Sequence, residues 1–228
     1  MSRVIAVDGP SGAGKSSVSR EVGRRLGYLH VDSGALYRIM TWQALARGVD
    51  TSDPAAVAAM AGDVDIECRP EGGRIAYYVG GEAPGERIRL PEINAHASKV
   101  SSVKEVRDRI TALLRGMVKY GDLVVEGRDI TTAVFPDSPA RFYLTASAEA
   151  RAMRRQKEEV EKGIANQSRE AVKESLLARD RLDSTRKFAP LRKADGAVEI
   201  DSTSMTLEEV ILAVLAALPP EWREVARA

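Results

Sequence analysis

The chain has little of what builds disulfide-bonded, metal-binding and membrane proteins. Its 228 residues include one cysteine, Cys68, and two histidines, His30 and His96. One cysteine excludes an intramolecular disulfide and a cysteine-built zinc site, and two distant histidines do not make a histidine-rich metal centre. The longest aliphatic run, residues 210–218, has nine residues, whereas a membrane-spanning helix needs about 20.

An excess of charge of one sign is lacking as well. The 34 basic and 33 acidic residues leave a net charge of +1, so no overall field draws the protein to nucleic acid or to a membrane. The apolar segment at residues 4–7 is too short for the core of a secretory signal, and Asp8 ends it. We therefore expect a cytoplasmic protein that binds neither nucleic acid nor membrane. Its 44% apolar and 29% charged residues are typical of a globular domain.

Strand and helix patterns alternate along most of the chain. Residues 4–8 form a β-branched run that Gly9-Pro10 ends, as in a buried parallel strand. The patterns predict further strands at residues 28–32, 123–126, 140–145 and 198–201, and helices at residues 15–26, 35–47, 54–60, 103–120, from Ser147 onward, and at 206–218. This order indicates an α/β fold, a parallel sheet with helices on both faces in three layers.

Two insertions interrupt this order. Residues 63–90 alternate with period two between glycine pairs, which predicts a small antiparallel β insert. From Arg141 to Lys193 the chain is polar and helical, with 14 lysines and arginines against 8 acidic residues. This stretch is typical of a basic helical lid over an anionic ligand. We therefore expect one core with two insertions.

The segment between the first strand and the first helix matches the phosphate-binding loop pattern GxxxxGK[ST]. Its backbone amides and the helix N-terminus can hold a phosphate chain. The ammonium of Lys15 can reach the β- and γ-phosphates, and the Ser16 hydroxyl can ligate Mg²⁺. The predicted ATP-binding residues are Gly9, Pro10, Ser11, Gly12, Ala13, Gly14, Lys15, Ser16 and Ser17.

The loop does not by itself identify the reaction, because motors, switches, kinases and synthetases share it. Arginines offer a second indication. Five of them fall at the ends of predicted elements, on or near the ligand-binding edge of the sheet: Arg38, Arg107, Arg128, Arg179 and Arg186.

Several motifs occur in an order and spacing that identify a family. They are Asp8 to Ser16, the segment Asp32-Ser33-Gly34-Ala35-Leu36-Tyr37-Arg38, Gly127-Arg128-Asp129 followed by Val134-Phe135-Pro136-Asp137, and Arg179-Asp180 with Asp183, Arg186 and Ala189-Pro190-Leu191. Over about residues 3–216 the chain closely resembles the long-form bacterial cytidylate kinases. The resemblance implies Mg²⁺- and ATP-dependent phosphorylation of CMP and dCMP to their diphosphates. We expect a monomer whose partners are these small nucleotides.

The resemblance also implies a division of the single unit. The core comprises residues 1–37, 121–150 and 190–228, the monophosphate-binding region residues 38–120 with the insert at 63–90, and the lid about residues 151–189. The implied monophosphate contacts are Ser33, Tyr37, Arg38, Arg128 and Arg186. The implied cytosine contacts are Ser98, Arg107 and Asp129, and the implied pentose contacts are Arg179 and Asp183.

Catalytic roles follow from the same resemblance for Lys15, Arg128 and Arg186. Leu182 stands where some relatives have a basic residue. The resemblance therefore does not divide catalytic work among Arg151, Arg154, Arg155 and Arg181.

The chemistry suits these residues. The second pKa of a monophosphate is about 6, so its attacking oxygen is already anionic at pH 7 and needs no general base. A carboxylate is the group that accepts from the exocyclic amine of cytosine, which makes Asp129 the candidate for base selection. An ion pair between Asp129 and Arg128 is the alternative interpretation.

Two other functions compete. One is a kinase of the same class with another acceptor, such as UMP, AMP, shikimate or dephospho-coenzyme A. The other is a nucleotide-gated switch, although nothing in the sequence resembles a guanine-reading motif.

Overall fold

A computed structural model describes residues 2–161 and 168–223 of the chain. In chain order its elements are β1 (Val4–Asp8), α1 (Lys15–Leu26), β2 (Leu29–Asp32), α2 (Ser33–Ala46), α3 (Pro54–Ala61), β3 (Ile66–Glu71), β4 (Arg74–Val79), η1 (Gly85–Arg89), α4 (Pro91–Ser101), α5 (Lys104–Gly116), η2 (Met117–Tyr120), β5 (Leu123–Gly127), η3 (Ile130–Val134), β6 (Ala140–Thr145), α6 (Ala148–Glu161), α7 (Arg169–Thr185), β7 (Val198–Asp201), α8 (Leu207–Ala216) and α9 (Pro220–Arg223). Residues 162–167 of the expected lid and 224–228 of the expected core lie outside the described residues.

The strands form one sheet in the order β3-β4-β2-β5-β1-β6-β7. Five neighbouring strands are parallel, in the order β2-β5-β1-β6-β7, so β1 lies in their centre between β5 and β6. All five residues of β1 are buried. Parallel strands covered on both faces have continuous apolar sequences, and for this reason the short segment 4–8 was enough to predict a buried parallel strand. The sheet confirms the predicted α/β fold.

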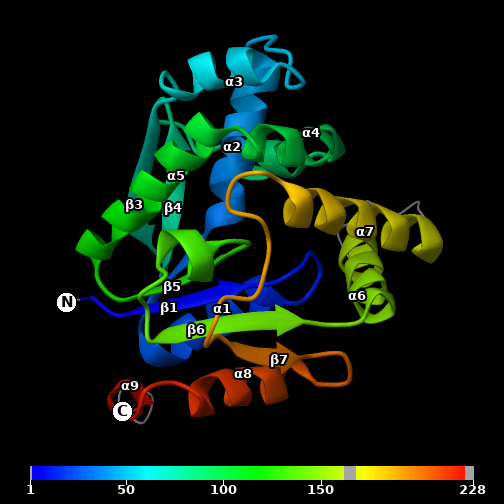
Figure 1. Ribbon diagram of the computed structural model, residues 1–228. Helices are drawn as coiled ribbons and strands as arrows, with labels where there is room; N and C mark the ends of the chain where they lie inside the picture. The colour runs from blue at the N-terminus through cyan, green and yellow to red at the C-terminus, as the bar shows by residue number, and fades with distance from the viewer. Residues whose placement is uncertain (1, 162–167, 224–228) are drawn as a thin grey trace.

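Alternate side chains of β1 belong to two hydrophobic cores, one on each face of the sheet. Val4 and Ala6 lie in the core between the sheet and helices α2 and α5, whereas Ile5 and Val7 lie in the core between the sheet and helices α1 and α8. The alternation follows from the two-residue period of a strand. Figure 1 shows the resulting layers, with α2 to α5 above the sheet and α8 below it.

The antiparallel insert is present, and it extends the main sheet. β3 pairs with β4 antiparallel over six residue pairs. β4 joins β2 through the single pairing of His30 with Arg74, and the His30 amide donates to the Gly73 carbonyl at 3.0 Å. The insert therefore continues the edge of the sheet and does not form a sheet of its own.

The helical arm, defined as α6 and α7, projects from the carboxyl end of β6 (Figure 1). Ser147 caps α6, since its hydroxyl accepts from the Ala150 amide at 3.2 Å, as predicted. The two helices pack together through Ala152, Val172 and Leu176. This small core is separate from the two that cover the sheet, so the arm is joined to the rest mainly by polar contacts.

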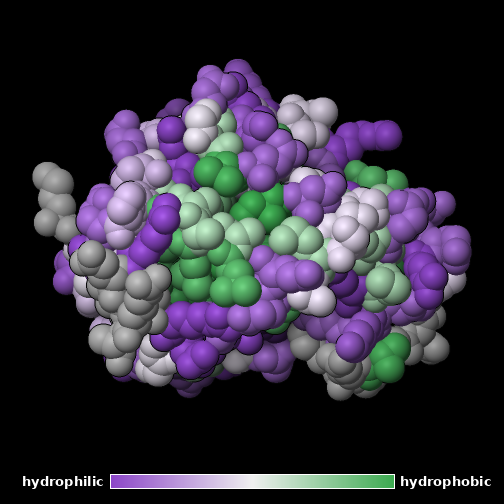
Figure 2. Space-filling model, turned by 90° about the horizontal axis from the view of Figure 1, so that it is seen from below, coloured by the Kyte–Doolittle hydropathy of each residue, from purple (hydrophilic) through white to green (hydrophobic). Residues whose placement is uncertain are grey.

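The face below the sheet carries an apolar patch. Figure 2 shows hydrophobic side chains gathered near the middle of this face. On α8, Leu207 and Leu212 are each about half exposed. Within residues 2–161 and 168–223, no helix combines the length and apolar character that crossing a membrane requires.

Candidate active site

The phosphate-binding loop runs from the end of β1 to the start of α1. Gly9 is required there because a Cβ would lie 1.9 Å from the Leu144 carbonyl oxygen. Gly14 caps α1 with φ of +89°, in the left-handed region that favours glycine. The loop therefore packs against β6 and turns sharply into the helix, with the first amides of α1 directed at its concave side.

Lys15, in the first turn of α1, folds back onto this loop. Its Nζ donates to the carbonyl oxygens of Gly9 at 2.9 Å and Pro10 at 2.8 Å. Burial, and next the nearby charge of Arg128, lowers the pKa of the Lys15 ammonium to about 7. The loop thus holds a cation whose charge is costly until an anion lies beside it.

Asp8 ties the loop to the segment after β5. Its carboxylate accepts from the Ile130 amide at 2.9 Å and from the Thr131 amide and hydroxyl at 2.7 and 2.6 Å. Burial raises the pKa of Asp8 to about 6, although the Thr131 hydrogen bonds oppose the rise. These bonds fix the position of the Arg128-Asp129 segment relative to the phosphate-binding loop.

Glu126 lies beside the loop and is not among the residues that the sequence predicts for the site. Its Oε2 accepts from the Ser16 hydroxyl at 2.8 Å, and its Oε1 lies 3.0 Å from His30 Nε2. Its carboxylate occurs next to the carboxyl end of β5, which neighbours β1 in the sheet. A strand-terminal carboxylate beside the loop was the signal that could have indicated it.

The predicted monophosphate contacts Ser33, Tyr37 and Arg38 lie together at the start of α2. The Ser33 hydroxyl donates to the Glu126 carbonyl at 2.6 Å, and Arg38 Nη2 donates to Asp32 Oδ2 at 2.9 Å. The Tyr37 hydroxyl is buried without a hydrogen-bond partner in the described part of the chain. Burial raises the pKa of Tyr37, so its hydroxyl stays protonated and available as a donor.

Asp129 is the centre of a buried ion cluster. Arg107 Nη2 donates to its Oδ2, Arg186 Nη2 lies 3.5 Å from its Oδ1, and Arg107 Nη1 donates to the Ser101 carbonyl at 2.9 Å. Arg107 also lies over the Tyr37 ring, 5.3 Å from its centre. These contacts bring together residues from α2, from α4, from α5, and from the segments that follow α7 and β5.

The end of the arm supplies the other side of this cluster. Arg128 Nε donates to Asp183 Oδ2 at 3.1 Å, and Arg186 Nη1 lies 3.8 Å from Asp183 Oδ1. Arg179 Nε is buried with no hydrogen-bond partner among residues 2–161 and 168–223. Burial, and next the charge of Arg128, lowers the pKa of Arg179 to about 10.

A second contact joins the arm to the phosphate-binding loop. Asp180 Oδ1 accepts from the Ser11 amide at 3.0 Å, and Asp180 also pairs with Arg151. Arg151 in turn donates to the Ser11 carbonyl at 3.0 Å. The Asp180–Arg151–Ser11 contact therefore holds the arm against the loop.

Other expected residues lie apart from the cluster. Ser98, on α4, accepts through its carbonyl from the Ser101 hydroxyl at 3.1 Å and has no described contact with Asp129. Arg154 binds the Ser202 hydroxyl at 2.9 Å, and Arg155 pairs with Glu158 and Glu159 on its own helix. These arginines stabilise the arm and its junction with the core.

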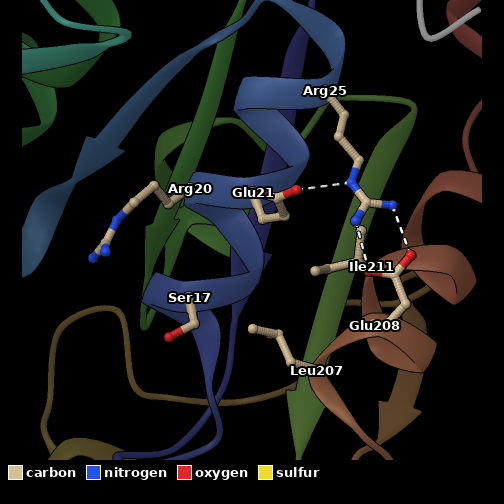
Figure 3. Close-up of a pocket in the computed structure, with 7 residues that line it drawn as sticks. All are labelled: Ser17, Arg20, Glu21, Arg25, Leu207, Glu208 and Ile211. Atoms are coloured by element: carbon tan, nitrogen blue, oxygen red, sulfur yellow. Dashed lines mark hydrogen bonds and ion pairs between the residues drawn. The ribbon is translucent and has the colours of Figure 1, made fainter.

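Ser17, the last predicted ATP contact, lines a groove between α1 and α8. Figure 3 shows this groove, with Arg25 reaching across from α1 to Glu208 of α8. Arg25 also donates to Glu21 at 2.9 Å. This ion pair network holds the two sides of the groove together, and none of the residues that line the groove belongs to the ion cluster around Asp129.

Comparisons with known proteins give a consistent result. A family model described as cytidylate kinase matches residues 5–219. The cytidylate kinase of Streptomyces avermitilis is 45% identical over 214 residues, covering 93% of this chain and 90% of that protein. The cytidylate kinase of Mycolicibacterium paratuberculosis is 46% identical over 211 residues, covering 91% of each. Among solved structures, an uncharacterized protein from Eubacterium ventriosum shares the fold, with a TM-score of 0.52 at 11% identity over 95% of this chain and 97% of that one.

Proposed function

Because this chain belongs to the cytidylate kinase family, we propose that it transfers the terminal phosphoryl group of ATP to CMP and dCMP, giving CDP or dCDP and ADP. The observation that carries the proposal is the ion cluster around Asp129, which joins a candidate base-reading carboxylate to arginines suited to a monophosphate. None of the comparisons favours a different acceptor or a switch function.

Electrostatics explains why the reaction needs this many cations. A monophosphate carries up to about −2 at pH 7, and it must approach a triphosphate of the same sign. We assign Lys15 to the phosphates of ATP, and Arg38, Arg128 and Arg186 to the acceptor phosphate and the transferred group. Since the acceptor oxygen is already ionised, catalysis consists of positioning and charge stabilisation and needs no general base.

Cytosine selection falls to Asp129 in this proposal. Its carboxylate would accept from the exocyclic amine of cytosine, whereas uracil would present a carbonyl oxygen to the same carboxylate. The paired Arg107 keeps Asp129 in one orientation and is itself buried. Ser98 remains a predicted base contact, and Arg179 and Asp183 remain predicted pentose contacts.

The oxygen atoms beside the loop fit Mg²⁺. Ser16 Oγ and the Glu126 carboxylate lie within 2.8 Å of each other, and magnesium typically takes one or two protein oxygens, with phosphate oxygens and water as its other ligands. Among the described residues, no group of three or more metal-binding side chains occurs. We therefore propose that the ion binds with the nucleotide, held by Ser16 and Glu126, and neutralises charge on the phosphates.

The helical arm is proposed as the lid. Asp180 and Arg151 bind the phosphate-binding loop at Ser11, which supports a cover that keeps water, a competing acceptor, from the reacting phosphates. We retain the division into a core (1–37, 121–150, 190–228), a monophosphate-binding region (38–120) and a lid (151–189). We also propose that the enzyme acts as a monomer in the cytoplasm.

The test is a coupled ADP-release assay with each nucleoside monophosphate in turn. We expect rapid release with CMP and dCMP and slow release with UMP and AMP. ADP release that is no faster with CMP than without an acceptor would refute the proposal, and faster release with UMP or AMP would reassign the acceptor.

A further inference from the structure

A hydrogen-bonded chain of three side chains lies under the phosphate-binding loop. It runs from His30 on β2 through Glu126 on β5 to Ser16 on α1, with heavy-atom distances of 3.0 and 2.8 Å. His30 and Glu126 are both buried, at 7% and 4% exposed. Strands β2 and β5 are neighbours in parallel register, with Asp32 opposite Glu126, so the pairing of the strands brings the two side chains together.

The chemistry of the three groups fixes their roles. A carboxylate only accepts hydrogen bonds, so His30 Nε2 carries the proton directed at Glu126 Oε1. The Ser16 hydroxyl donates its single proton to Glu126 Oε2, so the lone pairs of Ser16 Oγ remain available to a cation. The two oxygens of Glu126 are thus held from opposite sides, and the carboxyl plane cannot rotate without breaking one of these bonds.

We propose that His30 is a positioning residue for the magnesium–nucleotide complex, acting through Glu126 on the oxygens that would hold the ion. This inference rests on the proposed function. Without His30, one carboxylate oxygen of Glu126 loses its buried partner, and the carboxylate can turn away from the orientation that Ser16 shares. Groups that orient metal ligands in this way typically contribute about 10- to 100-fold to metal affinity.

The experiment measures metal binding directly. Calorimetry gives the dissociation constant of ADP in EDTA and in excess Mn²⁺, and the ratio of the two constants is the gain in affinity from the metal. We expect His30→Leu to lower this ratio about tenfold. This is the lower end of the 10- to 100-fold range, because phosphate and water supply the other ligands of the ion. The affinity for ADP in EDTA should stay unchanged. His30→Gln, which keeps a donor at the same number of bonds from Cβ, should restore most of the ratio.

A matched control is His96→Leu, because His96 Nδ1 also bonds one side chain, the Thr51 hydroxyl at 2.6 Å, but on α4 away from the loop. It should leave the ratio at the wild-type value. In a Glu126→Gln background, His30→Leu should have no further effect, since a residue that acts through Glu126 cannot act without it.

A His30→Leu ratio equal to the wild-type ratio, or a full effect of His30→Leu in the Glu126→Gln background, would overturn the inference. Should His30→Leu not fold, His30→Asn carries the same expectation because its side chain is too short to reach Glu126. ADP release with CMP by the wild-type enzyme is measured separately, so failure of the proposed function and failure of this positioning role are distinguishable.

Discussion

The buried Lys15 ammonium leads to a prediction about proton uptake on nucleotide binding. Its Nζ donates hydrogen bonds to two carbonyl oxygens of its own loop, those of Gly9 and Pro10, and burial lowers its pKa to about 7. A phosphate chain in the loop would bring negative charge beside this group and favour its protonated form. Binding of ADP above pH 7 should therefore take up a proton from solution.

The magnitude follows from the two pKa values. At pH 8 about nine-tenths of Lys15 is neutral in the free protein. A return toward its ordinary pKa of 10.5 would protonate nearly all of it, so about 0.9 proton is taken up per ADP. The full shift corresponds to about 5 kcal/mol of coupling between proton and phosphate. The dissociation constant of ADP should rise up to about tenfold per pH unit from pH 7.5 to 9.5.

Calorimetry in two buffers of different ionisation enthalpy measures the uptake at each pH. Lys15→Met has no group that titrates in this range, and Lys15→Arg is protonated throughout, so both should bind ADP without the uptake. A wild-type dissociation constant that is flat over these two pH units, with no buffer-dependent heat, would refute the assigned state of Lys15.

Three further predictions address base selection, the lid and stability. Asp129→Asn should lower the preference for CMP over UMP in kcat/KM by about 10- to 100-fold, the worth of a specific base contact, while the KM for ATP changes little; equal losses for both acceptors would contradict the base-reading role. Asp180→Ala should speed hydrogen exchange of the Ser11 amide about tenfold, because a hydrogen bond to a charged group is lost, and an unchanged exchange rate would show that the arm does not depend on this contact. Asp8, with its pKa raised to about 6, contributes stability that is present below about pH 4 and is lost as the pH rises through 6, by about 3 kcal/mol. The free energies of unfolding of wild type and Asp8→Asn, measured in urea, should diverge by that amount between about pH 4 and 6. A difference that does not change with pH would contradict the raised pKa of Asp8.

The central layers of the fold were predictable because their signals are local. The buried run of β1 and the glycines that follow it are contiguous, and the capped ends of α1 and α8 carry their own signals at Gly27 and Thr206. Helix α4 was not predicted, since only four of its eleven residues are buried. Its start was nevertheless signalled by Pro91 at the first helical position.

The ion pairs of the candidate site were not predictable in the same way. The sequence places Arg128 next to Asp129 and leaves open a pair between them, but Arg128 turns to Asp183 and Asp129 receives Arg107 and Arg186. Each of these partners lies 22 or more positions away from its acidic or basic counterpart. Such choices depend on where α5 and α7 dock against β5, and no residue pattern within one element specifies that.

The pattern of pairing also separates the arginines by role. Arg128 and Arg186 lie near one another but each has a carboxylate of Asp183 or Asp129 within 4 Å, which offsets their mutual repulsion and fixes their orientation before any phosphate arrives. Arg179 differs, because its buried Nε has no partner in the described residues and its pKa is lowered to about 10. An anion beside Arg179 would therefore offset the desolvation cost of its buried guanidinium. An anion beside Arg128 would instead have to share that guanidinium with Asp183. On this reasoning we propose that Arg179 contributes affinity for the bound nucleotide, and that Arg128 and Arg186 contribute its alignment.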